Sequence, residues 1–240
     1  RSLAPKPGRW VTLYVGTTKV LDLDVTAKGS FKLGAHGTYR TAALGWAPEW
    51  ESRHPAAWFE RRWPDIEHYL NNVVESVVDG RKHLKEGLVQ SAISRFPDND
   101  FTVIDREAVV GYTDIAERNQ HHAAVSRTVL ASLRRHDPPS WWSKTKPKGV
   151  STECDILAVS PHGQLIAVEV KPYTAKGMVA SAPVQAITYA ARFQSWLTTN
   201  RDSAPTIVGQ LLEQMVQVGL MPAGDYPTLN PDLPVRAMAV

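Results

Sequence analysis

The chain is short of cysteine and of long apolar segments. Cys154 is the only cysteine among 240 residues, which excludes an intramolecular disulfide and a cysteine-based zinc finger. The longest apolar runs, such as 165–168, are far shorter than the roughly 20 residues that cross a membrane. The first seven residues contain no apolar segment of the kind found in signal peptides. We therefore expect a cytoplasmic protein that contacts no membrane.

The composition is that of a globular protein. Hydrophobic residues make up 43% of the chain and charged residues 21%, which excludes wholesale disorder. A chain of this length buries a large core without disulfides and forms one large domain or two small ones. The net charge of +3 permits a nucleic-acid partner without requiring one.

Residues 1–105 have the pattern of an accessory region that is rich in β-strands and then helical. Segments 10–15 and 20–25 carry the β-branched and aromatic residues that favour strands. A helix is expected to begin with Pro64 in its first turn, because apolar residues recur at helical spacing after it. A second helical segment and a short strand at 101–104 follow. We expect this region to contact a substrate, sense a ligand or mediate oligomerisation.

Residues 106–240 have the pattern of an α/β domain. The sequence predicts a helix over 114–135, two strands over 153–159 and 164–171 joined by a hairpin, a helix over 183–197, and a last strand over 235–240. Both central strands are apolar on both faces, which is typical of a central sheet flanked by helices.

Acidic residues are expected to meet at the end of the predicted hairpin. Because side chains alternate along a strand, Glu169 and Lys171 share a face, as do Glu153 and Asp155. If the loop at 160–163 is symmetric, two residues of the paired strands stand opposite each other when their numbers sum to about 323. A one-residue adjustment of this register places Asp155 directly opposite Glu169, with Cβ atoms about 5 Å apart.

Two carboxylates that lie so close repel each other, and a divalent cation would relieve the repulsion. Magnesium prefers hard oxygen ligands in octahedral geometry. The main-chain carbonyl of Val170 offers a third oxygen, and Glu153 is a further candidate ligand. Lys171 would then orient or deprotonate an attacking water and stabilise negative charge that develops on phosphorus.

The arrangement of Asp155, thirteen intervening residues and then Glu169-Val170-Lys171 resembles the PD-(D/E)xK nuclease superfamily, which includes restriction enzymes, Holliday-junction resolvases and RecB-like exonucleases. The resemblance implies that Asp155 and Glu169 bind Mg²⁺ or Mn²⁺ and that Lys171 is catalytic. It also implies a restriction-endonuclease-like core, ordered helix, three antiparallel strands, helix, strand, which we expect to run from about Asp114 to Val240.

Two further motifs agree with this resemblance. Gln185 and Tyr189, four residues apart on one helix face, resemble the Gln-x-x-x-Tyr element of RecB-like nucleases, which implies that both face the active site. Glu153-Cys154-Asp155 resembles a Glu-x-Asp form of the second motif, with Cys154 where the family name has proline. For the acid that the family often carries on the helix before the sheet, Glu117 is the candidate, and Gln120, His121 or His122 fit the helix phase about as well.

Each motif also has an interpretation without catalysis. The acids and Lys171 would form an exposed ion-paired edge, and Gln185 and Tyr189 a polar pair beside the packing stripe Ala186, Ala190, Phe193 and Leu197. The His121–His122 pair is typical of a solvated helix face, and Cys154 of a small core residue. The basic and aromatic segment 140–149 would either stack bases and bind phosphates or pack on the domain as a loop.

We therefore expect a metal-dependent nuclease that hydrolyses phosphodiester bonds, of DNA in preference to RNA, in restriction, antiviral defence or DNA repair. Action as an endonuclease and action as an exonuclease are both left open. The alternative is a non-catalytic nucleic-acid-binding or structural module that retains the same fold. A homodimer is left open.

Overall fold

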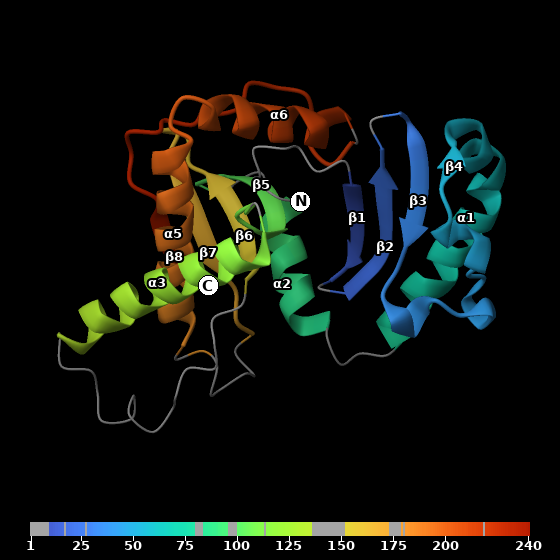
Figure 1. Cartoon of the computed structure of the whole chain (residues 1–240), viewed down its shortest axis with the longest axis horizontal. Helices are drawn as coiled ribbons and strands as arrows, with labels where there is room; N and C mark the ends of the chain where they lie inside the picture. Colours follow the sequence, from blue (N-terminus) through green and yellow to red (C-terminus); the bar gives the residue numbers. More distant parts are fainter. Residues whose placement is uncertain are drawn as a thin grey trace. The chain divides into compact units, whose positions relative to one another are not determined.

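The computed structural model describes residues 10–16, 18–26, 28–79, 84–95, 100–112, 114–135, 152–172, 179, 181–217 and 219–240. The chain divides between Ser91 and Ala92 into two compact units, each with a four-stranded sheet (Figure 1). The protein is therefore mixed α/β, and its units are described separately. Segment 140–149, with Trp141, Trp142, Lys144, Lys146 and Lys148, lies outside the described residues.

The first unit is an antiparallel sheet packed against one long helix. Its strands pair in chain order and its helix follows them. The elements are β1 (Trp10–Val15), β2 (Thr18–Val25), β3 (Ser30–Gly34), three 3-10 turns (Gly37–Tyr39, Ala42–Leu44 and Pro48–Glu51), β4 (His54–Pro55) and α1 (Ala56–Asp79). The short strands expected in this region are confirmed. Helix α2 (Leu84–Arg95) follows in the chain and spans the boundary between the units.

Aromatic side chains fill the centre of the first unit. The rings of Trp46, Trp50 and Tyr69 pack edge to face with centroids 5.1 to 5.6 Å apart. The Tyr69 hydroxyl is buried and donates a hydrogen bond of 3.0 Å to the carbonyl of Val20 in β2. Burial of the ring raises the pKa of Tyr69 to about 12. These contacts fix α1 against the sheet.

Helix α1 begins earlier than the sequence indicates. It starts at Ala56, so Pro64 lies inside the helix rather than in its first turn, and this expectation was wrong. Proline removes one backbone hydrogen bond to the residue four positions before it. Pro64 and Glu60 are both exposed, so the Glu60 carbonyl that loses its helical partner lies on the solvent side of α1. The helix therefore continues through the proline.

The second unit is a mixed sheet flanked by helices (Figure 1). Strands β5, β6 and β7 are antiparallel, and β8 runs parallel to β7 at the sheet edge. The elements are β5 (Thr102–Ala108), α3 (Ile115–Arg134), β6 (Cys154–Val159), β7 (Leu165–Glu169), α5 (Ala182–Thr199), α6 (Ala204–Gln217) and β8 (Arg236–Ala239).

The first strand of this sheet comes before α3 and not after it. The sequence analysis assigned a strand at 101–104 to the N-terminal region, ended that region at 105, and began the nuclease core near Asp114. In the structure, β5 pairs with β6 from Thr102 to Ala108, so the expected boundary between 105 and 106 falls inside a strand of the second sheet. The buried side chains of Ile104 and Ala108 join the core of the second unit, which explains the pairing.

The core of the second unit lies between the sheet and helices α5 and α6. All residues of β6 and β7 are buried, as expected for central strands. Helix α5 packs on β7 and β8, and α6 packs on β5. The expected stripe on α5 is confirmed, since Ala186, Ala190, Phe193 and Leu197 are all buried. Helix α6 is an element that the sequence analysis did not predict.

Candidate functional site

The β6–β7 hairpin brings Asp155 and Glu169 to the same end of two neighbouring strands. Val159 pairs with Leu165 and Ile156 pairs with Val168, so the loop has five residues, 160–164. The extra residue shifts the register by one relative to the symmetric loop. Continued by one position, this register places Asp155 opposite Glu169, as the sequence analysis expected.

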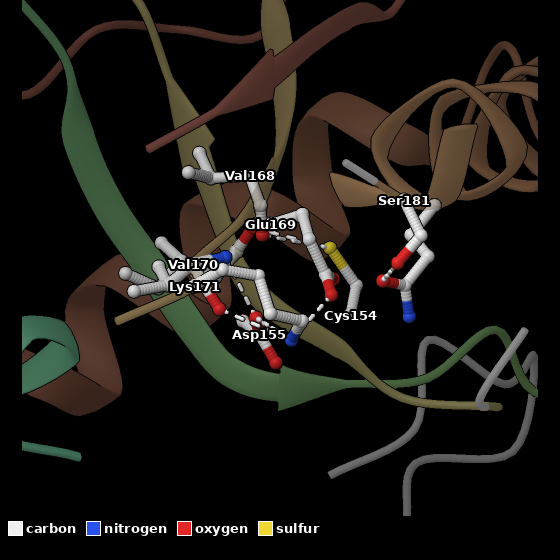
Figure 2. A network of polar contacts seen from close by, with 9 residues as sticks. Cys154, Asp155, Val168, Glu169, Val170, Lys171 and Ser181 are labelled. Atoms are coloured by element: carbon white, nitrogen blue, oxygen red, sulfur yellow. Dashed lines mark hydrogen bonds and ion pairs between the residues drawn. The ribbon is translucent and has the colours of Figure 1, made fainter. Parts of the chain in front are cut away.

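The two carboxylates and the Lys171 ammonium converge on one point (Figure 2). The Lys171 Nζ atom lies 2.6 Å from Glu169 Oε1 and 3.8 Å from Asp155 Oδ2. It also donates to the main-chain carbonyl of Val170 at 3.1 Å. The ammonium therefore touches or faces three of the four expected cation ligands, and Glu153 is the one that it does not contact in these bonds.

A main-chain hydrogen bond fixes the Asp155 carboxylate. The N–H of Val170 donates to Asp155 Oδ2 at 2.7 Å, a short bond of the charge-assisted type. Because Val170 lies between Glu169 and Lys171, this bond ties the end of β7 to the start of β6. The orientation of Asp155 is thus set by the backbone that also carries the other two groups.

The site is buried and holds three charged side chains. Glu169 is 1% exposed and Asp155 8% exposed, and the Lys171 side chain is 6% exposed. Buried charges require partners, and the Lys171 ammonium serves as one for both carboxylates.

The last strand holds the Glu169-Val170-Lys171 segment in place. The N–H of Val240 donates to the carbonyl of Glu169 at 2.9 Å, and the N–H of Lys171 donates to the carbonyl of Val240 at 2.9 Å. These bonds continue the parallel β7–β8 ladder beyond Glu169. The backbone beneath Glu169 and Lys171 is therefore paired on its β8 side.

Helix α5 brings Tyr189 to the carboxylates, while Gln185 has a local partner. Tyr189 is buried; burial raises its pKa and the nearby Glu169 carboxylate raises it further, so its hydroxyl stays protonated. Gln185 is half-buried, and its Oε1 accepts a hydrogen bond of 3.2 Å from Ser181 Oγ. In Figure 2, Ser181 and Lys171 lie on opposite sides of Cys154.

Glu153 and Glu117 are exposed, whereas Asp155 and Glu169 are buried. Glu153 is exposed, immediately before β6. Glu117 is exposed on α3 and lines a cavity of about 400 Å³ with Ser195 and Asn200, at the end of α5. Among the described residues, Glu117 does not form a metal-binding group with Asp155 and Glu169.

Cys154 belongs to the core, as expected. Its side chain is fully buried, and its Sγ atom lies 3.3 Å from the carbonyl of Ile156. Burial raises the pKa of the thiol well above its usual range, and the charges of Asp155 and Glu169 act in the same direction. A thiol in this environment stays protonated and unreactive.

The interpretation of the histidine pair as a solvated helix face is wrong. His121 and His122 are half-buried, and His121 links two elements: its Nδ1 lies 2.7 Å from the Tyr112 hydroxyl and its Nε2 lies 3.0 Å from Ser195 Oγ on α5. Burial and the Arg192 guanidinium lower the pKa of both imidazoles, that of His122 to about 4. His121 therefore joins α3 to α5, and the lowered pKa values favour the neutral form of both imidazoles.

Two features near the site were missed by the sequence analysis. Arg192 is buried and lies over the ring of Tyr189, with Cζ 5.5 Å from the ring centroid; an arginine within the apolar stripe of α5 was its signal. Arg106 on β5 pairs with Ile156 on β6, so the next residue, Glu107, lies opposite Asp155. The backbone φ angle of Glu107 is 52°. No sequence pattern reveals such a left-handed residue, which costs about 1–2 kcal/mol.

The chain was compared with protein-family models, curated proteins and solved structures, and none of them matches it. None of the helices in the described part of the chain is long and apolar enough to span a membrane. Within the same residues, no group of three or more His, Cys, Asp or Glu side chains is placed to hold a metal ion. Glu153 therefore does not join Asp155 and Glu169 in such a group, and the candidate oxygen donors are two carboxylates and the Val170 carbonyl.

Proposed function

We propose that the second unit is a metal-dependent nuclease of the PD-(D/E)xK type, acting on DNA. The observation that carries the proposal is the convergence of Asp155, Glu169 and Lys171 from two paired strands at one buried point. The topology supports it as well. In the second unit, the chain order of β5, β6, β7, α5 and β8 contains the three antiparallel strands, helix and strand of that core, with α3 and α6 as additions.

The donor set fits a divalent cation. Carboxylate oxygens of Asp155 and Glu169 and the carbonyl oxygen of Val170 surround the position of the Lys171 ammonium. These are hard oxygen donors, which Mg²⁺ and Mn²⁺ prefer. Since the flexible lysine side chain holds that position, it would move aside when the cation binds. When bound, the cation would polarise the scissile phosphate and lower the pKa of the attacking water.

The protein groups would share the remaining work. Asp155, held by the Val170 N–H, and Glu169, held by the β8 pairing, would keep the cation in a fixed position. Lys171, displaced from Glu169, would orient the attacking water and stabilise the negative charge that develops on the phosphoryl oxygens. The protonated Tyr189 hydroxyl and the Gln185 amide would orient Glu169 and the phosphate from the α5 side.

A second candidate function is a non-catalytic nucleic-acid-binding module with the same core. The 2.6 Å contact between Lys171 and Glu169 favours it, since a buried ion pair of this kind neutralises part of the charge without a metal. This module would bind nucleic acid equally well with and without metal, and Lys171→Ala would leave that binding unchanged.

A cleavage panel tests the proposal. Supercoiled plasmid, linear duplex, single-stranded DNA and RNA are incubated with the wild type in Mg²⁺, Mn²⁺ or EDTA, and with Asp155→Asn and the control Asp202→Asn, an exposed acid on the loop between α5 and α6. Cutting of DNA that requires metal, vanishes in Asp155→Asn and persists in Asp202→Asn supports the nuclease. Metal-independent binding without cutting supports the second candidate.

A further inference from the structure

A chain of hydrogen-bonding groups links α3 to α5, which pack on each other (Figure 1). The Ser195 Oγ atom lies 3.0 Å from His121 Nε2, and His121 Nδ1 lies 2.7 Å from the Tyr112 hydroxyl. All three side chains are half-buried, and all three line the cavity of about 400 Å³ that Glu117 lines. A serine within hydrogen-bond reach of a base, with a third group that orients the base, is the arrangement that activates a nucleophile.

Ser195 differs from the threonines of its helix. The hydroxyls of Thr188, Thr198 and Thr199 donate to the carbonyls four residues before them, which is a common bond of such side chains within a helix. The Ser195 hydroxyl lies instead against His121 of α3. Its position is therefore set by the packing of two helices, as it is in a site assembled from two elements.

The protonation states suit a base and its orienting group. Burial and the Arg192 guanidinium lower the pKa of His121, so the imidazole is neutral at pH 7 and one of its nitrogens accepts a proton. Burial raises the pKa of Tyr112 to about 12, so the phenol stays protonated and uncharged. In the tautomer that serves a base, the Nδ1–H group donates to the Tyr112 oxygen and Nε2 accepts the Ser195 hydroxyl.

The other walls of the cavity indicate the class of substrate. Besides burial, the positive charge of Arg192 and the negative charge of Glu117 act on the pKa of His121 in opposite directions. These charges partly cancel at the imidazole, so a neutral substrate fits better than an anion or a cation. Apolar groups of Val110 and Trp196 line the same cavity, whose volume is near the lower end of the range for small-molecule sites. The substrate is therefore small and partly apolar.

We propose that Ser195 is the nucleophile and His121 the general base of a second active site, which hydrolyses small neutral carboxylic esters. The Ser195 oxygen forms a bond to the carbonyl carbon while its proton passes to His121 Nε2. The bond from that carbon to the leaving alcohol then breaks, and the alcohol takes the proton. Water, deprotonated by His121, attacks the acyl-serine, releases the acid and restores the hydroxyl.

Two further residues of the cavity have roles in this reaction. The Gln120 side-chain amide, which lines the cavity, stabilises the negative charge that develops on the carbonyl oxygen. Tyr112 is a positioning residue, since it holds the His121 ring through Nδ1. The reaction uses no metal, so it goes beyond the nuclease chemistry proposed at Asp155 and Glu169 and is independent of it.

Covalent labelling tests the nucleophile. The full chain is incubated in EDTA with a fluorophosphonate, whose phosphorus forms a bond to the serine oxygen while fluoride leaves and the serine proton passes to His121. Peptide mass spectrometry should locate the adduct at Ser195 of the wild type and find none at that position in Ser195→Ala. The control Thr198→Ala removes an exposed hydroxyl of the same helix and should be labelled at Ser195 like the wild type. A wild type without label at Ser195 overturns the proposal.

Hydrolysis of p-nitrophenyl butyrate in EDTA tests the other roles. Ser195→Ala and His121→Phe should lower kcat/KM by about 10² or more. Tyr112→Phe should lower kcat by about tenfold at an unchanged KM, because the phenol only orients the base. Thermal melts establish which variants fold, and Ser195→Ala decides alone if His121→Phe does not.

Equal hydrolysis by Ser195→Ala and the wild type overturns the proposal. Labelling that is as fast in a folded His121→Phe variant as in the wild type overturns it equally, because His121 is then not the base. Ester hydrolysis in EDTA by a chain that cuts no DNA would support this site and count against the nuclease, so the two proposals fail separately.

Discussion

Asp155 accepts the backbone N–H of Val170 at 2.7 Å, so the acid on β6 is oriented by the peptide that separates Glu169 from Lys171. The three side chains are consequently placed by one piece of backbone, which is itself paired with Val240. Their relative positions therefore depend on the sheet and not on flexible loops.

The hydrogen bond to Val170 distinguishes two substitutions of Asp155. Asparagine retains an oxygen that accepts the Val170 N–H, whereas alanine leaves this buried donor unsatisfied at a cost of about 1–3 kcal/mol. We expect both variants to lose cleavage, and Asp155→Ala to be less stable than Asp155→Asn by about that amount. Urea unfolding of the two variants measures the difference. Equal stabilities would show that the bond does not hold Asp155.

Removal of the Lys171 ammonium is expected to destabilise the second unit. Lys171→Met leaves two buried carboxylates without their cation, and breaking a buried ion pair in this way costs about 3–5 kcal/mol. The matched control is Lys19→Met, because Lys19 forms a 2.6 Å pair with Asp22 at the surface, where such pairs contribute about 0–1 kcal/mol.

Thermal melts with and without Mg²⁺ extend this comparison. A cation bound by Asp155 and Glu169 replaces the missing positive charge, so Mg²⁺ should raise the melting temperature of Lys171→Met more than that of Lys19→Met. A Lys171→Met variant that is as stable as Lys19→Met and indifferent to Mg²⁺ would contradict the described cluster.

The lowered pKa of His122 makes stability depend on pH. Its value of about 4 in the folded protein lies below the unfolded value near 6.5, so the unfolded state binds more protons in between. The contribution of His122 to the free energy of unfolding is therefore fully present above pH 6.5 and is lost as the pH decreases towards 4. Allowing for solvent screening at this half-buried position, we expect a loss of about 1–2 kcal/mol.

His122→Phe isolates this contribution. Phenylalanine keeps a ring against Tyr112, which the imidazole contacts edge to face at 5.4 Å, and it cannot accept a proton. Urea midpoints of both proteins from pH 7 to 4 should therefore fall more steeply for the wild type. Parallel curves would mean that His122 titrates as it does in the unfolded chain.

Gly163 is expected to tolerate no side chain. Its φ is +82°, and a Cβ atom would lie 2.3 Å from the carbonyl oxygen of Thr228, in the segment that leads to β8. Gly163→Ala should cost about 2–4 kcal/mol through strain and displaced backbone. The control Gly209→Ala, at a position on α6 with open space around it, should stabilise the protein by about 0.5–1 kcal/mol. Chemical unfolding of both variants measures the change in the free energy of unfolding. Similar changes in the two variants would contradict the expectation that Gly163 tolerates no side chain.

The part of the site that sequence predicts well is the part built from neighbours in the chain. Asp155, Glu169 and Lys171 lie on one hairpin, so alternation along the strands and the approximate length of the loop, with a register adjustment of one residue, placed Asp155 opposite Glu169. Tyr189 was proposed from the resemblance to the Gln-x-x-x-Tyr element. Glu117 was proposed from the resemblance alone, as an acid on the helix before the sheet, and this does not specify where that helix packs.

Features that depend on distant contacts could not be predicted in this way. The pairing of β5 with β6 spans more than 45 positions along the chain and includes α3, so local pattern assigned β5 to the wrong region. The same holds for the bond between His121 and Ser195, and for the Val240 bonds to the Glu169-Val170-Lys171 segment. Each of these depends on how elements pack, which periodicity does not encode.

The most direct test of the central claim is the single-turnover rate of duplex DNA cleavage as Mg²⁺ is titrated, for the wild type, Asp155→Asn, Glu169→Gln and the control Asp202→Asn. The account predicts saturable, Mg²⁺-dependent cleavage by the wild type and Asp202→Asn, and rates lower by about 10² to 10³ or more for both site variants. Equal rates in all four proteins, or the absence of cleavage at any Mg²⁺ concentration, would contradict it.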